Sequence, residues 1–293
     1  MRKYQFTNKL MFAIVMRDPT ACRGLIERLF PGKKVKTIYF PGQDGRSREA
    51  KGESMREAVA EVEKTMINGL ESRSVRLDVL FEEDNTLYDI EMQIDREEEI
   101  AKRSRYYHTS MARQGLKKGQ PYRMLKSNYV IFVCCYDAFD MDAPIYRFEM
   151  FDNNLQLKLG DGSSTIILNT KCSKEKIPQE LMAFYDFVDT GRVDASDTFV
   201  KYLDTRVEEA NNDEEVDRIM TLEEEMIVRY DSGLQKGRAE GRAEGRAEGR
   251  AEGRAEGAAL KQREIAQNLK NAGIPIPMIA ETTGLTQKEV EML

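Results

Sequence analysis

Two acidic residues occupy matching places in two short apolar segments that flank a polar turn. In the stretch RLDVLFEEDNTLYDIEMQ, residues 76–93, the first segment contains Asp78 and the second contains Glu91. A two-residue hairpin turn at Asp84 and Asn85 makes the numbers of opposing residues add up to about 169, which places Asp78 opposite Glu91. Their β carbons are then about 5 Å apart, and like charges at such positions destabilise a sheet.

A divalent metal ion between the two carboxylates would relieve this repulsion. Mg²⁺ is bound in proteins by one or two carboxylates, with waters and a substrate phosphate completing its shell. The pair therefore indicates a metal site. The alternative is a solvated polar face on which Arg76, or a lysine from elsewhere, neutralises the acids.

The same register assigns the other side chains of the hairpin to two faces. Arg76 lies opposite Gln93 and Leu80 opposite Asp89, and these residues share the face of the two acids. The other face is apolar and is predicted to belong to the core; it consists of Leu77, Val79, Phe81, Tyr88, Ile90 and Met92.

The segments around the hairpin alternate between helical and strand patterns, which predicts an α/β fold. Helices are expected at residues 10–16, 22–30, 55–67 and 97–116, and again between 178 and 229. Strands are expected at residues 34–40 and 128–136, and turn residues at 152–154 and 160–162 indicate an antiparallel meander over 145–170. Residues 42–74 are expected to form an irregular insertion with some helix.

A four-residue repeat, GRAE, runs from Gly237 to Gly257. In a helix this period would place Glu above Glu and Arg above Arg, and each Gly would cost about 1 kcal/mol relative to Ala. No aromatic residues are interleaved for stacking on bases. The repeat is therefore interpreted as a spacer, partly helical or flexible.

The segment after the repeat is typical of a small helix-turn-helix. Ala280, Gly284 and Val290 match the contact, turn and contact positions of that motif. The second helix carries Lys288 as its one cation, beside two glutamates, so a small dimerisation bundle is the alternative to a DNA-reading role. The chain is accordingly divided into a main domain at 1–232, a linker at 233–259 and a helical segment at 260–293.

Composition excludes several classes of protein. The chain has 293 residues, of which 41% are hydrophobic and 33% charged, and its longest uncharged apolar run, YVIFVCCY, is too short to cross a membrane. No secretory signal is recognisable, so a cytoplasmic location is expected. The four cysteines lack metal-ligand spacing and are predicted to be free thiols. A net charge of −6 is unfavourable for a nucleic-acid partner as an average, but local basic patches decide such binding.

The hairpin sequence, together with KRSRYYHTSM, LKKGQPYRMLKSNYVIFVCCYDAF and TIILNTK, resembles the Rpn family of recombination-promoting nucleases, or putative transposases, a branch of the PD-(D/E)XK nuclease superfamily. The resemblance covers residues 4–230. It implies a restriction-endonuclease-like α/β core with a mixed sheet flanked by helices, Mg²⁺-dependent hydrolysis of DNA phosphodiesters, and a role in DNA recombination. The C-terminal repeats are similar to those attached to many relatives.

The resemblance also implies roles for individual residues. Asp78 and Glu91 correspond to the two metal-binding acids, and the backbone carbonyl of Met92 is available to complete the metal site. Gln93 stands where the superfamily more often has lysine; it can orient a water or donate to a phosphate, but it supplies no positive charge.

Contacts to the DNA backbone are expected from a basic cluster formed by Lys102, Arg103, Arg105, Lys117 and Lys118, for which an ordinary solvated helix face is the alternative. Tyr106, Tyr107 and His108 are candidates to line the site, and core packing is the alternative for the tyrosine pair.

This chain departs from the family pattern at two places. Lys9 and Ala112 stand where relatives often have acids, and Glu53, Glu57 and Glu61 are candidate replacements. The resulting hypothesis is a Mg²⁺-dependent DNA endonuclease with slow turnover. Its expected partner is DNA, no membrane association is expected, and the C-terminal segment is a candidate for homo-oligomer formation. The alternative is a catalytically degenerate DNA-binding or regulatory protein with the same fold.

Overall fold

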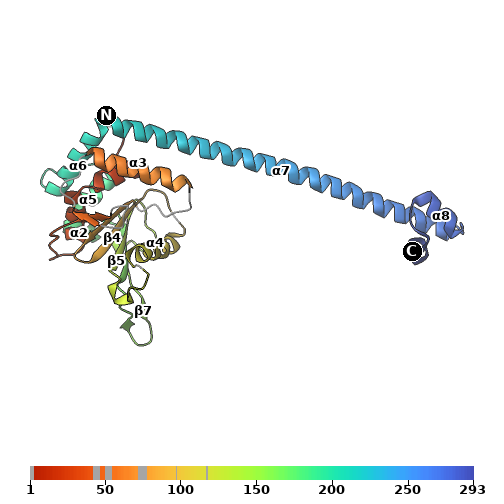
Figure 1. The fold of residues 1–293 in the computed structure, drawn as a ribbon, viewed down its shortest axis with the longest axis horizontal. Coiled ribbons are helices and arrows are strands. Elements are labelled where there is room, and N and C mark those ends of the chain that lie inside the picture. Colours follow the sequence, from red (N-terminus) through yellow and green to blue (C-terminus); the bar gives the residue numbers. More distant parts are fainter. Residues whose placement is uncertain (1–2, 42–46, 50–54, 72–77, 97, 117) are drawn as a thin grey trace. The chain divides into compact units, whose positions relative to one another are not determined.

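The computed structural model describes residues 3–41, 47–49, 55–71, 78–96, 98–116 and 118–293 (Figure 1). Two compact units are present, Met1–Leu222 and Glu223–Leu293. None of the described helices is both long and apolar enough to span a bilayer.

A seven-stranded mixed sheet forms the centre of the first unit. Its strand order is β2-β1-β3-β4-β5-β9-β6. The strands are β1 (Tyr39–Pro41), β2 (Ser47–Glu49), β3 (Val79–Glu83), β4 (Thr86–Gln93), β5 (Ser127–Cys134), β6 (Ile145–Phe148) and β9 (Ser163–Asn169). The pairs β4–β5 and β5–β9 are parallel, and the remaining pairs are antiparallel.

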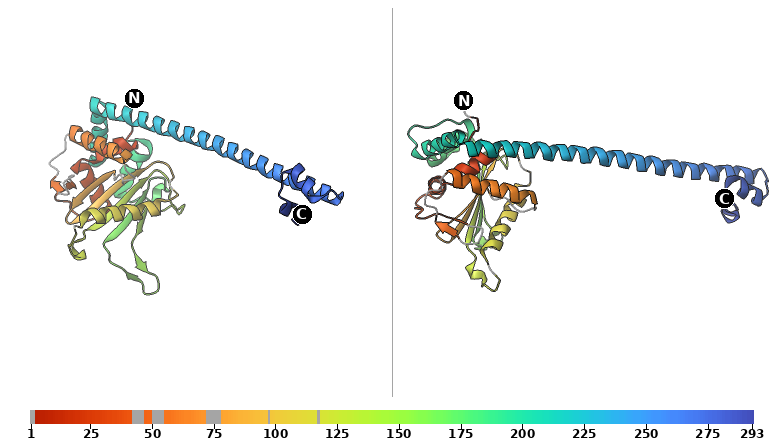
Figure 2. Two further views of the ribbon diagram at one scale, coloured as in Figure 1. Left: turned by 45° about the vertical axis from the view of Figure 1, so that its right-hand side comes forward. Right: turned by 45° about the horizontal axis from the view of Figure 1, so that its top comes forward.

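The expected meander over 145–170 is only partly present. β6 pairs antiparallel with β9, as expected, but β9 lies between β6 and β5 and also pairs parallel with β5. Two short strands, β7 (Phe151–Asp152) and β8 (Leu157–Lys158), form a separate hairpin arm that projects beyond the main sheet (Figures 1 and 2). The parallel pairing was missed because it depends on a crossover, which local turn signals do not encode.

Helices cover both faces of the sheet. α4 (Ile100–Gly115) packs on one face against β5, and α1 (Lys9–Met16) lies against β4 on the other face (Figure 1). α2 (Pro19–Leu29), α3 (Met55–Glu71) and α6 (Thr198–Asn211) pack against α1, and α5 (Gln179–Thr190) packs against α2 and α6. The expected helices are thus all present. Of the strand expected at 34–40, only the last two residues form a strand, as part of β1.

Local sequence signals explain where these helices begin and end. The side chain of Asn8 accepts hydrogen bonds from the backbone N–H groups of Leu10 and Met11 and so caps α1. Asp18 caps α2 in the same way, and Pro19 follows it at the first helical position. α5 ends at Thr190 and is followed by Gly191, whose φ of 72° suits glycine.

The second unit contains most of α7 and two short helices. α7 (Glu214–Asn271) is helical through the whole repeat, where a partly helical or flexible spacer was expected. Three of every four residues in the repeat are Arg, Ala or Glu, which have high helix propensity.

α8 (Ile276–Thr283) and α9 (Gln287–Met292) follow α7 and pack against its end. A turn separates these two helices. Gly284 has a φ of 74° at the turn, and Val290 is fully buried with Ala266 and Ile279.

Candidate active site

The hairpin register is the one expected from the sequence. Val79 pairs with Ile90 and Leu80 with Asp89, so opposing numbers add up as predicted across the turn. Asp84 and Asn85 have φ values of 47° and 57°, the left-handed geometry of a type I′ turn. The described members of the predicted core face, Val79, Phe81, Tyr88, Ile90 and Met92, are all buried, and Leu77 lies outside the described residues.

Asp78 and Glu91 meet where β3 begins. The backbone N–H of Asp78 donates to Oε1 of Glu91 over 3.0 Å, and the backbone N–H of Met92 donates to Oδ2 of Asp78 over 3.3 Å. Each carboxylate therefore reaches the backbone of the opposite strand. This reciprocal arrangement holds the two acids next to each other.

The face that carries these acids is buried, because α4 covers it. Asp89, Glu91 and Gln93 are 0%, 1% and 2% exposed. The pKa of Glu91 is raised well above its usual range by burial and by the charges of Asp78 and Asp89. The pKa of Asp89 is also raised well above its usual range, by burial and then by Asp78.

One arginine from α4 reaches into this acidic cluster. Arg103 Nη1 donates to Oε1 of Gln93 over 2.7 Å, and Nη2 donates to the hydroxyl of Tyr107 over 2.7 Å. The same Nη2 lies 3.7 Å from Oε2 of Glu91. The guanidinium of Arg103 thus supplies the positive charge that the Gln93 side chain lacks. Gln93 in turn orients the guanidinium by accepting its hydrogen bond.

The structure divides the residues expected to contact DNA into two groups. Arg103 and Tyr107 point toward the strand that carries the acids, and Tyr107 is only 7% exposed. Lys102, Arg105 and Tyr106 lie on the outer face of α4 and are exposed. Helical spacing accounts for this division, because Arg103 and Tyr107 are four residues apart while the other three fall on the opposite side.

Other candidate residues lie away from this cluster or outside the described part of the chain. Lys118 is exposed, and Lys117 and Glu53 lie outside the described residues. His108 bonds to Asn128 and to Thr165, on the part of α4 that faces β9. Glu57 and Glu61 are on α3, Lys9 is exposed in the first turn of α1, and Ala112 is half-buried on α4.

Sequence reasoning gave no role to Asp89 and placed Arg103 among the residues that contact the DNA backbone. Asp89 has no hydrogen-bond partner for either carboxylate oxygen, although it is fully buried. Its position two residues before Glu91, on the same strand face, was the available signal. The inward direction of Arg103 carried no such signal, because it depends on how α4 docks.

The donor atoms fit a hard divalent cation. Asp78, Glu91 and the Met92 carbonyl provide oxygen ligands, and crowded carboxylates with raised pKa values favour a bound cation. Among the described residues, no group of three or more His, Cys, Asp or Glu side chains is placed to hold a metal. A metal held here would depend on two carboxylates, a backbone carbonyl and ligands from water or substrate.

The mixed sheet between helices, with paired acids at the end of a central hairpin, defines the α/β class of nuclease-fold proteins. A family model described as PD-(D/E)XK nuclease family transposase matches residues 57–232, more than half of the chain, and the chain belongs to this family. No curated protein and no solved structure matches it. The family contains nucleases, so a nuclease-like or transposase-like function and a DNA substrate follow from membership.

Proposed function

We propose that this protein is a Mg²⁺-dependent DNA endonuclease that hydrolyses phosphodiester bonds. The observation that supports this most strongly is the pair Asp78 and Glu91, held side by side by reciprocal backbone hydrogen bonds beneath a cationic side chain. Two adjacent carboxylates, of which that of Glu91 is buried, repel each other and so favour a bound cation.

In this proposal Asp78, Glu91 and the Met92 carbonyl hold the metal ion. When bound, the metal would act as a Lewis acid on the phosphoryl oxygen and lower the pKa of the attacking water. Arg103, fixed by Gln93 and Tyr107, stabilises the charge that develops on the phosphoryl oxygens. Lys102, Arg105 and Tyr106 on the outer face of α4 contact the DNA backbone.

The test is nicking of a supercoiled plasmid by the purified full chain with and without Mg²⁺. Open circles that form only with the metal support the proposal. An intact plasmid at every Mg²⁺ concentration, with DNA binding retained, would instead support a second candidate function, a catalytically degenerate DNA-binding or regulatory protein.

A specific observation favours that second candidate. Arg103 already places a positive charge 3.7 Å from Glu91, so part of the repulsion among the acids is offset without a metal. Lys9 and Ala112 also stand at positions where acids were expected. Isothermal titration of Mg²⁺ into the protein separates the two functions, because the degenerate protein would release no heat of binding at this site.

The wider role that we propose is in DNA recombination or the mobility of a genetic element, in the cytoplasm and without membrane association. The description of the matched family as a transposase supports it. We further propose that the C-terminal helices from 260 onward mediate self-association, which sedimentation of the full chain would test. These helices share a small buried apolar cluster, Ala266, Ile279 and Val290.

A further inference from the structure

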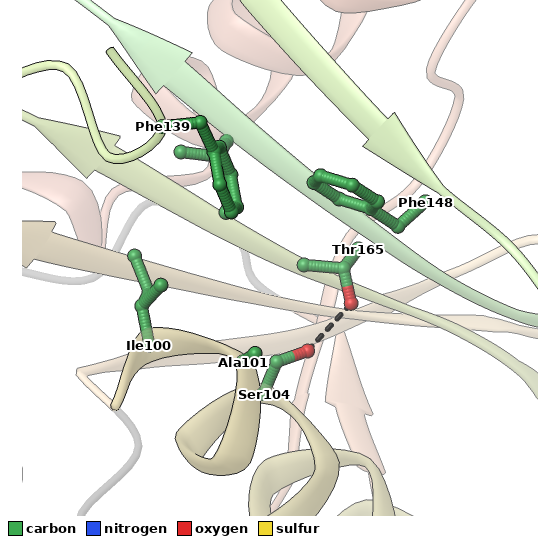
Figure 3. Close-up of a pocket in the computed structure, with 7 residues that line it drawn as sticks. Ile100, Ala101, Ser104, Phe139, Phe148 and Thr165 are labelled. Carbon is green, nitrogen blue, oxygen red and sulfur yellow. Dashed lines mark hydrogen bonds between the residues drawn. The ribbon is translucent and has the colours of Figure 1, made fainter. Parts of the chain in front are cut away.

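A cavity of about 250 Å³ is bordered by α4 (Figure 3). It lies on the same face of the sheet as the acids, because Asp89, Val130 and Thr165 are aligned across β4, β5 and β9. Pockets for drug-sized ligands begin at about 300 Å³, so this cavity suits one small ring system. Its walls come from α4, from β6 and β9, and from the loop after β5. They are formed by Ile100, Ala101, Ser104, Phe139, Phe148, Thr165 and Ile167.

Two aromatic rings, one from the loop after β5 and one from β6, line the cavity. Phe139 and Phe148 are 37% and 45% exposed, and their ring centroids are 5.2 Å apart. Aromatic faces that remain open to solvent beside a cavity are suited to stacking on a planar ring. Across the cavity, Ile100 and Ala101 of α4 add an apolar wall (Figure 3).

The floor of the cavity is polar. The hydroxyls of Ser104 and Thr165 are hydrogen-bonded to each other at 2.5 Å, and Nε2 of His108 lies 2.9 Å from the Thr165 hydroxyl. A hydroxyl has one donor and two acceptor positions, so the two hydroxyls can still accept a hydrogen bond from an N–H group. An aliphatic occupant would leave that capacity unused, whereas the edge of a nucleobase would use it.

Strand register gives the distance between this cavity and the acids. Asp89 pairs with Val130, Val130 with Thr165, and Thr165 with Phe148 across β4, β5, β9 and β6. Because neighbouring strands are about 4.8 Å apart, Thr165 lies about 10 Å from the acidic strand.

The outer face of α4 connects the two places. Arg103 and Tyr107 border the acids, Ala101 and Ser104 border the cavity, and the exposed Lys102 and Arg105 lie between these flanks. The ion pair of Lys102 with Glu99 is on the surface and contributes little, so Lys102 can exchange its partner for a phosphate. A DNA strand that crosses α4 here would have its backbone on cations and one base over the cavity.

We propose that this cavity binds an unpaired nucleobase of the DNA substrate, a few nucleotides from the bond that is cut. The inference rests on the proposed DNA substrate. A base within a duplex is stacked and paired, so the occupant comes from a single-stranded segment or from a nucleotide turned out of the helix. The substrate class is therefore DNA that contains unpaired nucleotides.

The test measures binding of a fluorescent short oligothymidylate to the full chain in EDTA, where no metal-dependent cleavage occurs. Phe139→Ala and Phe148→Ala should each weaken binding by about 5-fold or more, the effect expected for loss of one base stack. Phe151→Ala is the matched control, because Phe151 is 44% exposed on β7 and does not line the cavity. Its affinity should equal that of the unaltered protein.

A second measurement uses the unaltered protein and needs no variant to fold. A duplex that flanks the oligothymidylate holds the strand in one position on the protein, and EDTA removes the metal. A single abasic residue is then moved along the strand, and binding should weaken when it stands at one particular position. Three results would overturn the inference: equal affinity for every abasic position, an affinity in both cavity variants that is unchanged from that of the unaltered protein, or failure of the unaltered protein to bind the strand.

These outcomes are separable from the proposed nuclease activity. Plasmid nicking with unchanged strand affinity in both phenylalanine variants rejects the base site and leaves the nuclease proposal in place. Strand binding that depends on the cavity, in a protein that never nicks DNA, supports the base site and rejects the nuclease.

Discussion

Asp78 and Glu91 are the residues on which the proposed chemistry depends most directly. Asp78→Asn and Glu91→Gln should each abolish Mg²⁺-dependent nicking, since each removes a ligand charge. Neither change should unfold the protein, because it also removes repulsion within the acidic cluster. The checks are plasmid nicking and the Tm with and without Mg²⁺, which should rise less in the variants than in the unaltered protein.

Glu180→Gln is the control for these substitutions, because Glu180 is an exposed residue in the first turn of α5. It should nick DNA and respond to Mg²⁺ as the unaltered protein does. Acid variants that nick at the unaltered rate, with the same Mg²⁺-dependent rise in Tm, would place the active site elsewhere.

Arg103, oriented by Gln93, should supply the charge that a lysine supplies elsewhere in the superfamily. Arg103→Met should lower the nicking rate by about 100-fold or more, the effect of removing one stabilising donor from a transition state. Gln93→Lys alone should also lower the rate, since it replaces the acceptor of Arg103 Nη1 with a like charge. The double variant should recover part of the activity, because one cation again lies beside Glu91.

Arg105→Met is the comparison for Arg103→Met, as Arg105 lies on the exposed side of the same helix. It should weaken DNA binding, with a higher KM, and leave kcat nearly unchanged. A double variant that is no more active than Arg103→Met would contradict the idea that the two residues share one charge.

Asp89 gives the metal-free protein a distinctive dependence on pH. The pKa of Asp89 is higher in the folded than in the unfolded chain. Above about pH 4 the folded state therefore holds more protons than the unfolded state does. Its stabilising contribution is complete below that range and is lost as pH rises through the raised pKa. In EDTA, the Tm of Asp89→Asn should therefore rise relative to that of the unaltered protein as the pH increases from about 5 to about 8.

His108 has the opposite effect, since its pKa is lowered by burial and its neutral form is the stable one in the fold. It is present in both proteins, so its titration cancels in the comparison, which reports Asp89 together with its effect on the pKa of Glu91. A constant difference in Tm across this pH range would mean that Asp89 does not titrate there.

At the scale of elements, the hairpin turn determines the register on which the site depends. Asp84 and Asn85 both have positive φ values, which Asn and Asp tolerate better than most residues. Replacing both by Ala should lower the free energy of unfolding by about 1–2 kcal/mol per residue, whereas Asn85→Gly should leave it equal or higher. Urea unfolding followed by circular dichroism measures both changes.

Loss of nicking by the double alanine variant at temperatures where it remains folded would further show that register, as well as stability, has changed. A free energy of unfolding that is unaltered by the double replacement would contradict the left-handed geometry of the turn.

At the scale of the whole molecule, we expect the first unit to fold without the second. A chain that ends at Gln235 retains Val216, Ile219 and Met220, which are buried in α7. It should melt cooperatively with a Tm close to that of the full chain. A chain that ends at Asp213 lacks these three side chains and should be destabilised by several kcal/mol, at about 1.5–3 kcal/mol for each.

Circular dichroism melting of the two truncated chains tests this division. A non-cooperative melt of the chain that ends at Gln235 would show that the first unit needs the C-terminal helices. Self-association, in contrast, should be lost from both truncated chains if it depends on residues 260 onward.

Much of this protein follows from local sequence signals. The alternation of residues 76–93 and the Asp84-Asn85 turn determine the hairpin, and the hairpin determines that Asp78 and Glu91 meet. These are relations between residues close together in the chain, and they depend on the two-residue period of a strand and on the φ angles of two turn residues. Cap residues such as Asn8 and Asp18 likewise mark helix boundaries without reference to the rest of the fold.

Tertiary structure alone decided what surrounds the acids. The docking of α4 on the sheet buries Asp89 without a partner and brings Arg103 to Gln93 and Glu91. The insertion of β9 between β5 and β6 brings Thr165 and Phe148 beside Ser104 and so creates the cavity. Both depend on contacts between segments far apart in sequence, whose free energy comes from packing and burial and leaves no periodic signal in the chain.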